Sequence, residues 1–191
     1  MVPDFLTHYY SAARGPFTNL SDLPPAQAEA IQEQLRREGR GFAGRRAPDY
    51  LNVRRGLEQR IRDLFVARGG RPRRAHPHYM ILGACAWVLT WYPDGCELRM
   101  PLAAFPPDSL SFTYGDSFPA MRFADGKPYR GQVYTLADLP ELIARYGLPQ
   151  EWNADGHSGP ERYIEAQVWD DAALAAFLPP PARDRAGVIQ Q

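Results

Sequence analysis

The sequence predicts an α+β protein with an antiparallel-rich sheet, a helical pair near the N-terminus and one helix inserted among the later strands. Two long helical periodicities follow a single early strand, and from residue 78 onward short β-rich runs separated by turn residues dominate. Strands and helices do not alternate regularly, which argues against a parallel, doubly wound sheet. The 191 residues, 45% of them hydrophobic, are enough for one domain with a full core.

The N-terminal region predicts one strand followed by two helices. Residues 4–10 are rich in aromatic and β-branched side chains, which favour a strand. Ser21 and Asp22, followed by two prolines, are typical of a helix start, and this helix should end near Glu38. Residues 49–68 carry apolar side chains at three- and four-residue steps, so they predict a longer helix that ends at a Gly-Gly pair. The helical pair, at about 22–69, is thus inserted after the first strand.

The remainder of the chain predicts strands, a capped helix and a short final helix. Thr135 with Asp138 three residues later has capping-box spacing, which predicts a helix over 135–146. Asp170 is expected to cap a short helix to residue 177, three prolines follow, and we expect one domain over 1–178 and a flexible tail over 179–191. The expected strands are 78–82, 87–92 and 97–102 (a hairpin around Pro93-Asp94-Gly95), 110–114, 130–134 and 162–169.

Composition favours a cytoplasmic protein without a membrane span. No apolar run approaches the length of a transmembrane helix, and the N-terminus lacks the basic and apolar regions of a signal peptide. Cys85 and Cys96 are expected to be reduced thiols. Together with His76 and His78 they are the only cluster of soft metal ligands, but their spacing is not that of a zinc site, so we predict no metal.

The formal net charge of zero conceals a strongly basic segment. Thirteen arginines and four acidic residues lie between Arg36 and Arg74. Arginines that alternate with acids on a helix are usually a solvated surface. Arg71, Arg73 and Arg74, by contrast, lie in a loop without acids, and we expect them to contact a nucleic acid or an acidic protein surface.

The segment 111–119, Ser-Phe-Thr-Tyr-Gly-Asp-Ser-Phe-Pro, concentrates polar side chains at the end of a predicted strand, where binding sites are often built. Gly115-Asp116-Ser117 resembles the nucleophile block of the Gly-Asp-Ser lipases and esterases. Asp155-Gly-His157 has the wrong spacing for that family's base, and a nucleophile needs an adjacent base. A turn in which Asp116 and Ser117 bond the local backbone is therefore the preferred interpretation.

Three separated segments resemble the signature of ADP-ribosyltransferases: His8 on the first strand, Ser111-Phe-Thr-Tyr114 on a middle strand and Glu165 on the last strand. The resemblance implies NAD as substrate, with His8 on a ribose hydroxyl and Glu165 as the catalytic carboxylate. Tyr114 or Tyr79 would stack on the nicotinamide, and Ser111 and Thr113 would help to bind it. Glu161 is a competing candidate for the carboxylate.

A broader resemblance covers nearly the whole chain. Gly-Pro-Phe near the start, Gly-Gly-Arg-Pro followed by Pro-His-Tyr-Met, the segment 111–119, Tyr-Gly-Leu-Pro-Gln-Glu-Trp and Gly-Pro-Glu-Arg-Tyr-Ile-Glu look like an uncharacterised bacterial protein family. This resemblance implies no activity.

Two functional hypotheses follow from the sequence. The first is an NAD-dependent ADP-ribosyltransferase-like enzyme of the toxin or defence type, which transfers ADP-ribose to an unknown acceptor. The second is a non-enzymatic nucleic-acid or protein-binding module built on the arginine-rich region 36–74. A binding module of that kind would bind more weakly at high salt and after loss of the loop arginines.

Overall fold

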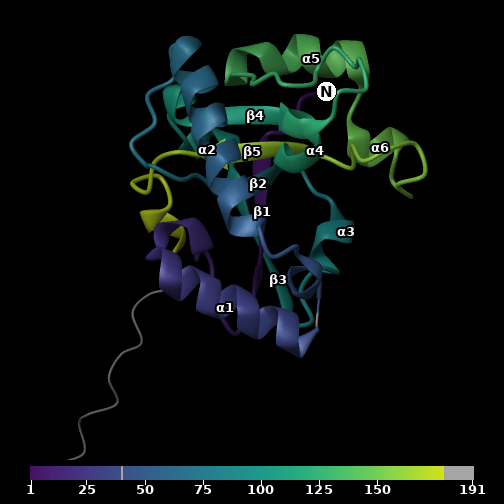
Figure 1. Ribbon diagram of the computed structural model, residues 1–191. Helices are drawn as coiled ribbons and strands as arrows, with labels where there is room; N and C mark the ends of the chain where they lie inside the picture. The colour runs from purple at the N-terminus through teal and green to yellow at the C-terminus, as the bar shows by residue number, and fades with distance from the viewer. Residues whose placement is uncertain (40, 179–191) are drawn as a thin grey trace, which may run out of the picture.

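A computed structural model describes residues 1–39 and 41–178, and they form an α+β fold around one five-stranded sheet (Figure 1). The strand order is β3-β1-β2-β5-β4, and every neighbouring pair is antiparallel. The strands are β1 (Phe5–Ser11), β2 (His78–Leu82), β3 (Gly95–Pro101), β4 (Leu110–Tyr114) and β5 (Ile164–Val168). The predicted fold class is confirmed.

The helices surround this sheet, and the predicted helical pair lies between β1 and β2 in the chain. The α-helices are α1 (Pro25–Glu38), α2 (Tyr50–Ala67), α3 (Ala86–Leu89), α4 (Ser117–Arg122), α5 (Leu139–Tyr146) and α6 (Pro149–Trp152). Short 3₁₀ turns occur at Leu20–Asp22, Ala43–Arg45, Leu102–Ala104, Pro107–Ser109, Leu136–Asp138 and Ala175–Phe177. The Thr135 capping box before α5 is present as predicted.

One face of the sheet packs into the main hydrophobic core. Phe112 and Tyr114 of β4 and the alternate residues of β5 are fully buried there, because successive strand residues point to opposite faces. Leu139 and Leu142 of α5 belong to the same core, so α5 covers this face.

The opposite face carries polar side chains that are also buried. The strand register aligns Thr7, Ile81, Glu165 and Thr113 in one row across β1, β2, β5 and β4. Beside this row, α2 packs against α4 and Trp169 through a second apolar cluster, whose members are Leu57, Ile61, Phe65, Met121, Val133 and Trp169. The helix therefore covers only part of this face, and the rest borders a cavity.

The predicted hairpin of 87–92 with 97–102 is wrong. Residues Ala86–Leu89 form α3, and β3 pairs along its full length with β1 instead. The apolar side chain of Val88 is buried by helical turns against Tyr9, Ile81 and Cys85, so this segment reaches the core without joining the sheet. Tertiary pairing with β1 overrides the local turn signal.

Two further predicted elements are shorter than expected. Residues 130–134 form no strand, because only Tyr134 bonds to β4, through a single bridge with Phe112. Residues 170–177 contain only the turn Ala175–Phe177, and the Asp170 and Asp171 side chains instead form ion pairs with Arg73 and Arg74. The helices α4 and α6 were not expected.

Among the helices of residues 1–39 and 41–178, none combines the length and apolar character needed to cross a membrane. The tail predicted over 179–191 lies outside the described residues.

Candidate functional site

A cavity of about 1120 Å³ lies between the polar face of the sheet and the surrounding helices. Its walls come from β1, β2 and β5, from the facing parts of α1 and α2, and from the starts of α3 and α4. Sites for small molecules and cofactors usually measure about 300–1,000 Å³. The cavity is thus large enough for a ligand of dinucleotide size.

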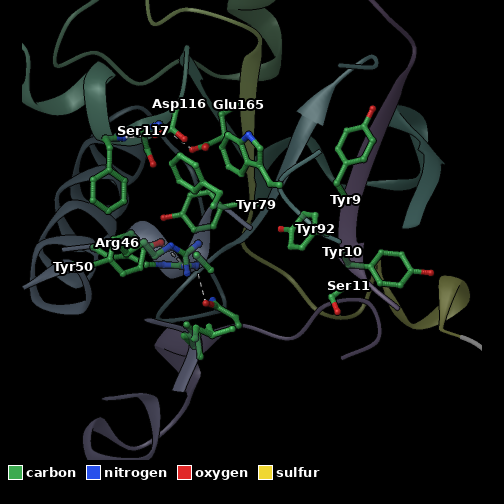
Figure 2. Close-up of a pocket in the computed structure, with 18 of the residues that line it drawn as sticks. Tyr9, Tyr10, Ser11, Arg46, Tyr50, Tyr79, Tyr92, Asp116, Ser117 and Glu165 are labelled. Carbon is green, nitrogen blue, oxygen red and sulfur yellow. Dashed lines mark hydrogen bonds between the residues drawn. The ribbon is translucent and has the colours of Figure 1, made fainter. Parts of the chain in front are cut away.

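A pair of buried carboxyl groups lies in the wall of this cavity. Glu165 projects from β5, and Asp116 follows the glycine at the end of β4 (Figure 2). Figure 2 shows the two carboxyl groups side by side. The Asp116 carboxylate caps α4 by accepting a 2.8 Å hydrogen bond from Phe118 N–H and a 3.0 Å bond from the Tyr163 hydroxyl. Glu165 accepts a 3.3 Å bond from Ser117 N–H.

The electrostatics of this carboxyl pair favour proton uptake. Burial, and then the negative charge of Asp116, raise the pKa of Glu165 well above its usual range. Burial also raises the pKa of Asp116, although the bonds from Phe118 and Tyr163 oppose this shift. Two like charges in a desolvated site cannot both persist at low cost, so we expect the carboxyl pair to share a proton near neutral pH in the free protein.

A polar ladder behind the cavity wall fixes the position of Glu165. The Trp169 indole donates to Ser111 Oγ over 2.8 Å, and this hydroxyl donates to Gln167 Oε1 over 2.8 Å. The Gln167 amide is thereby oriented, and its NH₂ group donates to Thr113 Oγ1 and Glu165 Oε1, both over 3.1 Å. Ser111 and Thr113 are fully buried and do not line the cavity. They position the carboxylate and are not placed to contact a ligand.

The opposite wall of the cavity is aromatic and cationic. The Arg46 guanidinium lies 4.3 Å over the Tyr50 ring, and Arg54 lies 4.9 Å over the Tyr79 ring. Arg54 is neutralised by Glu58, which accepts its Nε–H over 2.8 Å. Arg46 has no acidic partner among the described ion pairs, and its buried Nε has no hydrogen-bond partner there. Arg46 is therefore a cation available to an anionic ligand.

Tyr79 of β2 lies in the cavity wall on the same sheet face as Glu165, as Figure 2 shows. Its hydroxyl donates to Glu58 over 3.2 Å, and the same carboxylate accepts from Ser21 and contacts His76 Nδ1 over 2.7 Å. These contacts hold the ring in place. Of the two tyrosines considered from the sequence, Tyr79 is the one that borders the cavity.

His8 contributes to the cavity wall, but both of its ring nitrogens are occupied. Nε2 accepts a 3.1 Å bond from Phe17 N–H, so the other nitrogen, Nδ1, donates to the Tyr79 carbonyl over 3.1 Å. Strand alternation directs the ring away from the Glu165 face, and it stacks on Tyr10 and Phe17. Burial lowers the pKa of His8 to about 4. His8 is thus a neutral structural residue, not a free donor for a ribose hydroxyl.

Tyr114 does not meet Glu165 either. Its side chain is 1% exposed in the main core, where its hydroxyl donates to the Tyr146 carbonyl over 2.6 Å. Burial raises the pKa of Tyr114 to about 12. The ring packs against Tyr129 and Tyr146, on the face opposite the cavity. The competing carboxylate Glu161 is buried in ion pairs with Lys127 and Arg130.

The loop arginines are used within the protein. Arg73 pairs with Asp170 at 3.0 Å, and Arg74 is held between Asp22 and Asp171. Arg71 is 83% exposed and lies 3.9 Å from the carboxylate of Asp108. The α2 arginines behave similarly: Arg55, Arg60 and Arg62 donate to backbone carbonyls of neighbouring segments.

The sequence predicted no role in the site for four residues that the structure places there: Asp116 as an acid, Arg46, Tyr163 and Gln167. For Gln167 a signal was available, because Glu165 and Gln167 alternate onto one face of the same strand.

In residues 1–39 and 41–178, no three His, Cys, Asp or Glu side chains converge as a metal site requires. Comparisons with protein-family models, curated proteins and solved structures found no match to this chain.

Proposed function

We propose that this protein is an NAD-using, ADP-ribosyltransferase-like enzyme whose chemistry is carried by Glu165 together with Asp116. The observation that carries the proposal is the buried carboxyl pair in the wall of a dinucleotide-sized cavity. A carboxylate with a strongly perturbed pKa in a cleft is a typical feature of a catalytic site. The role that the sequence resemblance gave to Glu165 is kept, whereas His8 and Tyr114 are replaced by Asp116 and Tyr79.

The charges in the cavity match those of NAD, which is the substrate in this reaction. The carboxyl pair would face the cationic nicotinamide ring and the positive charge that develops on its ribose during cleavage. Arg46, with its unpartnered Nε, would bind the pyrophosphate. Tyr79 in the cavity wall offers an aromatic surface for one of the rings.

The proposed reaction breaks the bond between ribose C1′ and the nicotinamide nitrogen. The electron pair of that bond leaves with nicotinamide, and a nucleophilic N–H or O–H group of the acceptor forms a new bond to C1′. The proton of the acceptor passes to the carboxyl pair and then to water. For this step Glu165 must be a carboxylate, and a bound cation favours that state because an opposite charge lowers the pKa of a carboxyl group.

The second hypothesis, a non-enzymatic binding module on region 36–74, has less support. Most of its described cations are used in ion pairs or backbone contacts within the domain. Six of them are exposed, but all of these six except Arg45 have an acidic or backbone partner among the described residues: Arg37, Arg45, Arg60, Arg68, Arg71 and Arg73. A cytoplasmic location also remains part of the proposal.

The test combines NAD binding with nicotinamide release, for the wild type and for Glu165→Gln and Asp116→Asn. Glu165→Gln should bind NAD within a few-fold of the wild type but release nicotinamide at least about 100-fold more slowly, because stabilisation of developing charge is lost. Glu97→Gln is the control, since this carboxylate is exposed on β3 outside the cavity. Equal release by the wild type and Glu165→Gln would rule out the assignment.

A further inference from the structure

An aromatic mouth, formed by Phe42, Trp87 and Trp91, opens the cavity to solvent. All three residues line the cavity, and Phe42 and Trp87 are 44% and 37% exposed. Phe42 stacks on Trp91 with ring centroids 4.4 Å apart, while Trp87 meets Trp91 edge to face at 5.1 Å. Trp91 thus covers one face of the Phe42 ring, and no second aromatic ring of the described residues stacks on Phe42. Large aromatic side chains left exposed together usually mark an interaction site.

Three unpartnered hydrogen-bond donors belong to side chains that line the same cavity. The buried atoms Arg46 Nε, Trp91 Nε1 and Arg162 Nε have no hydrogen-bond partner within the described residues, and all three side chains line the cavity. Arg162 also lies 4.2 Å over the Trp87 ring. A buried donor without a partner costs about 1–3 kcal/mol, so these groups favour a ligand that carries acceptor oxygens. Two of them belong to guanidinium groups, which favours an anion.

The aromatic mouth is connected to the carboxyl pair. The Trp91 ring meets the Tyr163 ring at a centroid distance of 6.5 Å, and the Tyr163 hydroxyl donates to Asp116 over 3.0 Å. The mouth, Tyr163 and Asp116 thus form one continuous side of the cavity. A molecule stacked at the mouth can extend toward Asp116 and Glu165.

We propose that the aromatic mouth binds an unpaired nucleobase of a single-stranded nucleic acid, so that a neighbouring nucleotide of the same strand extends into the cavity as the acceptor of ADP-ribose. The base would extend the Trp91–Phe42 stack on the face of Phe42 turned away from Trp91, and the adjacent phosphate would accept from the unpartnered Nε–H of Arg162. Every base has a face that stacks on an aromatic ring, and single strands leave that face accessible. A protein acceptor would not carry a planar ring with a phosphate beside it at each residue, so it would not offer the same combination of stacking and anion binding.

The transfer itself rests on the function proposed above, whereas the stacking does not. In the transfer, an N–H or O–H group of the neighbouring nucleotide bonds to C1′ of the NAD ribose as nicotinamide leaves with the old bond's electron pair. The proton of that nucleotide passes to the carboxyl pair. No oxidant or reductant is needed.

The chain offers a matched pair of substitutions for the test. Phe42→Leu removes the stacking surface at the mouth while keeping an apolar side chain. Phe123→Leu is the control, because Phe123 is 51% exposed, does not line the cavity, and has the Arg130 guanidinium 5.3 Å over its ring. Thermal melts establish that both variants fold.

Binding of labelled short single-stranded DNA and RNA is measured by fluorescence anisotropy without NAD. We expect Phe42→Leu to weaken binding by about 5- to 100-fold, the range measured for loss of one stacked base, and Phe123→Leu to leave it unchanged. A duplex or an abasic strand should bind more weakly than the intact single strand. Binding that is absent, or equal for both variants, overturns the proposed acceptor.

This experiment separates the two proposals. Single strands that bind at the mouth of a protein that cleaves no NAD would overturn the proposed function and keep the nucleic-acid site. Cleavage of NAD by a protein that binds no single strand would overturn the nucleic-acid site and keep the proposed function, and it would indicate a protein acceptor. Loss of single-strand binding when NAD saturates its own site would assign the mouth to the adenine of NAD, because transfer requires both to be bound together, and this also overturns the acceptor proposal.

Discussion

Replacing His8 with glutamine is expected to remove a large part of the acid sensitivity of folding. His8 is 8% exposed, and its two ring nitrogens bond to the backbone of Phe17 and Tyr79. Only the neutral ring can accept from Phe17 N–H, so the folded state resists protonation of His8. A glutamine side chain can donate and accept hydrogen bonds but does not titrate.

The magnitude follows from the pKa of His8, which burial lowers from 6.5 to about 4. A histidine whose folded-state pKa is depressed contributes its full stability above the unfolded pKa, and this contribution is lost as the pH falls through the folded pKa. One pKa unit corresponds to about 1.36 kcal/mol, so the lowered pKa corresponds to about 3 kcal/mol of stability, most of which is lost by about pH 4.

The assay is urea denaturation of the wild type and His8→Gln at a series of pH values from about 7.5 to about 4. The wild type should lose about 3 kcal/mol more than the variant over this range, which corresponds to about 6–12 °C in Tm for a chain of this size. His78, whose pKa is also lowered by burial, is present in both proteins and cancels in the difference. Parallel stability curves would refute the assignment of His8 as a buried neutral residue.

Three further predictions concern the stability of the fold. Glu165→Gln should stabilise the protein near pH 8, because a raised carboxyl pKa means that stability falls as the pH rises; a variant that denatures in less urea than the wild type at this pH contradicts it. Arg74→Ala should cost on the order of 1–3 kcal/mol because its side chain is 14% exposed between two carboxylates, whereas Arg71→Ala should cost less than about 0.5 kcal/mol, and equal melting temperatures would speak against the distinction. Tyr114→Phe should lower the unfolding free energy by about 1–2 kcal/mol because the Tyr146 carbonyl loses its donor, which an unchanged denaturation curve would disprove.

Most of the fold could be predicted from local signals. The strands 78–82 and 110–114 have the predicted bounds, and the apolar stripe of α2 was visible as a three- and four-residue repeat. The hairpin prediction failed because sheet pairing is decided by distant segments. Pro93-Asp94-Gly95 does form a turn-rich connection, but β3, which begins at Gly95, pairs with β1. The paired residues lie far apart in the chain, from Ser11 with Gly95 to Phe5 with Pro101.

The candidate site was only partly predictable. Glu165 could be proposed from its place on the last strand, but which residue accompanies it depends on the folded arrangement. Asp116 was expected to bond a local turn, and it does bond Phe118 N–H, yet the same turn also brings its carboxylate to Glu165. His8 and Glu165 lie on neighbouring rows of the sheet, and strand register alone decides which face each side chain occupies.

The most direct test of the carboxyl pair as the cation-binding, catalytic centre is the number of protons released when NAD binds. Calorimetric titrations at about pH 6, in buffers of different ionisation enthalpy, give this number. A proton is expected to be released because a bound cation favours the ionised carboxyl groups over the protonated pair of the free protein. The account predicts release of a substantial fraction of a proton by the wild type and a much smaller release by Glu165→Gln. Binding of NAD with no proton release, or with the same release in both proteins, would contradict it.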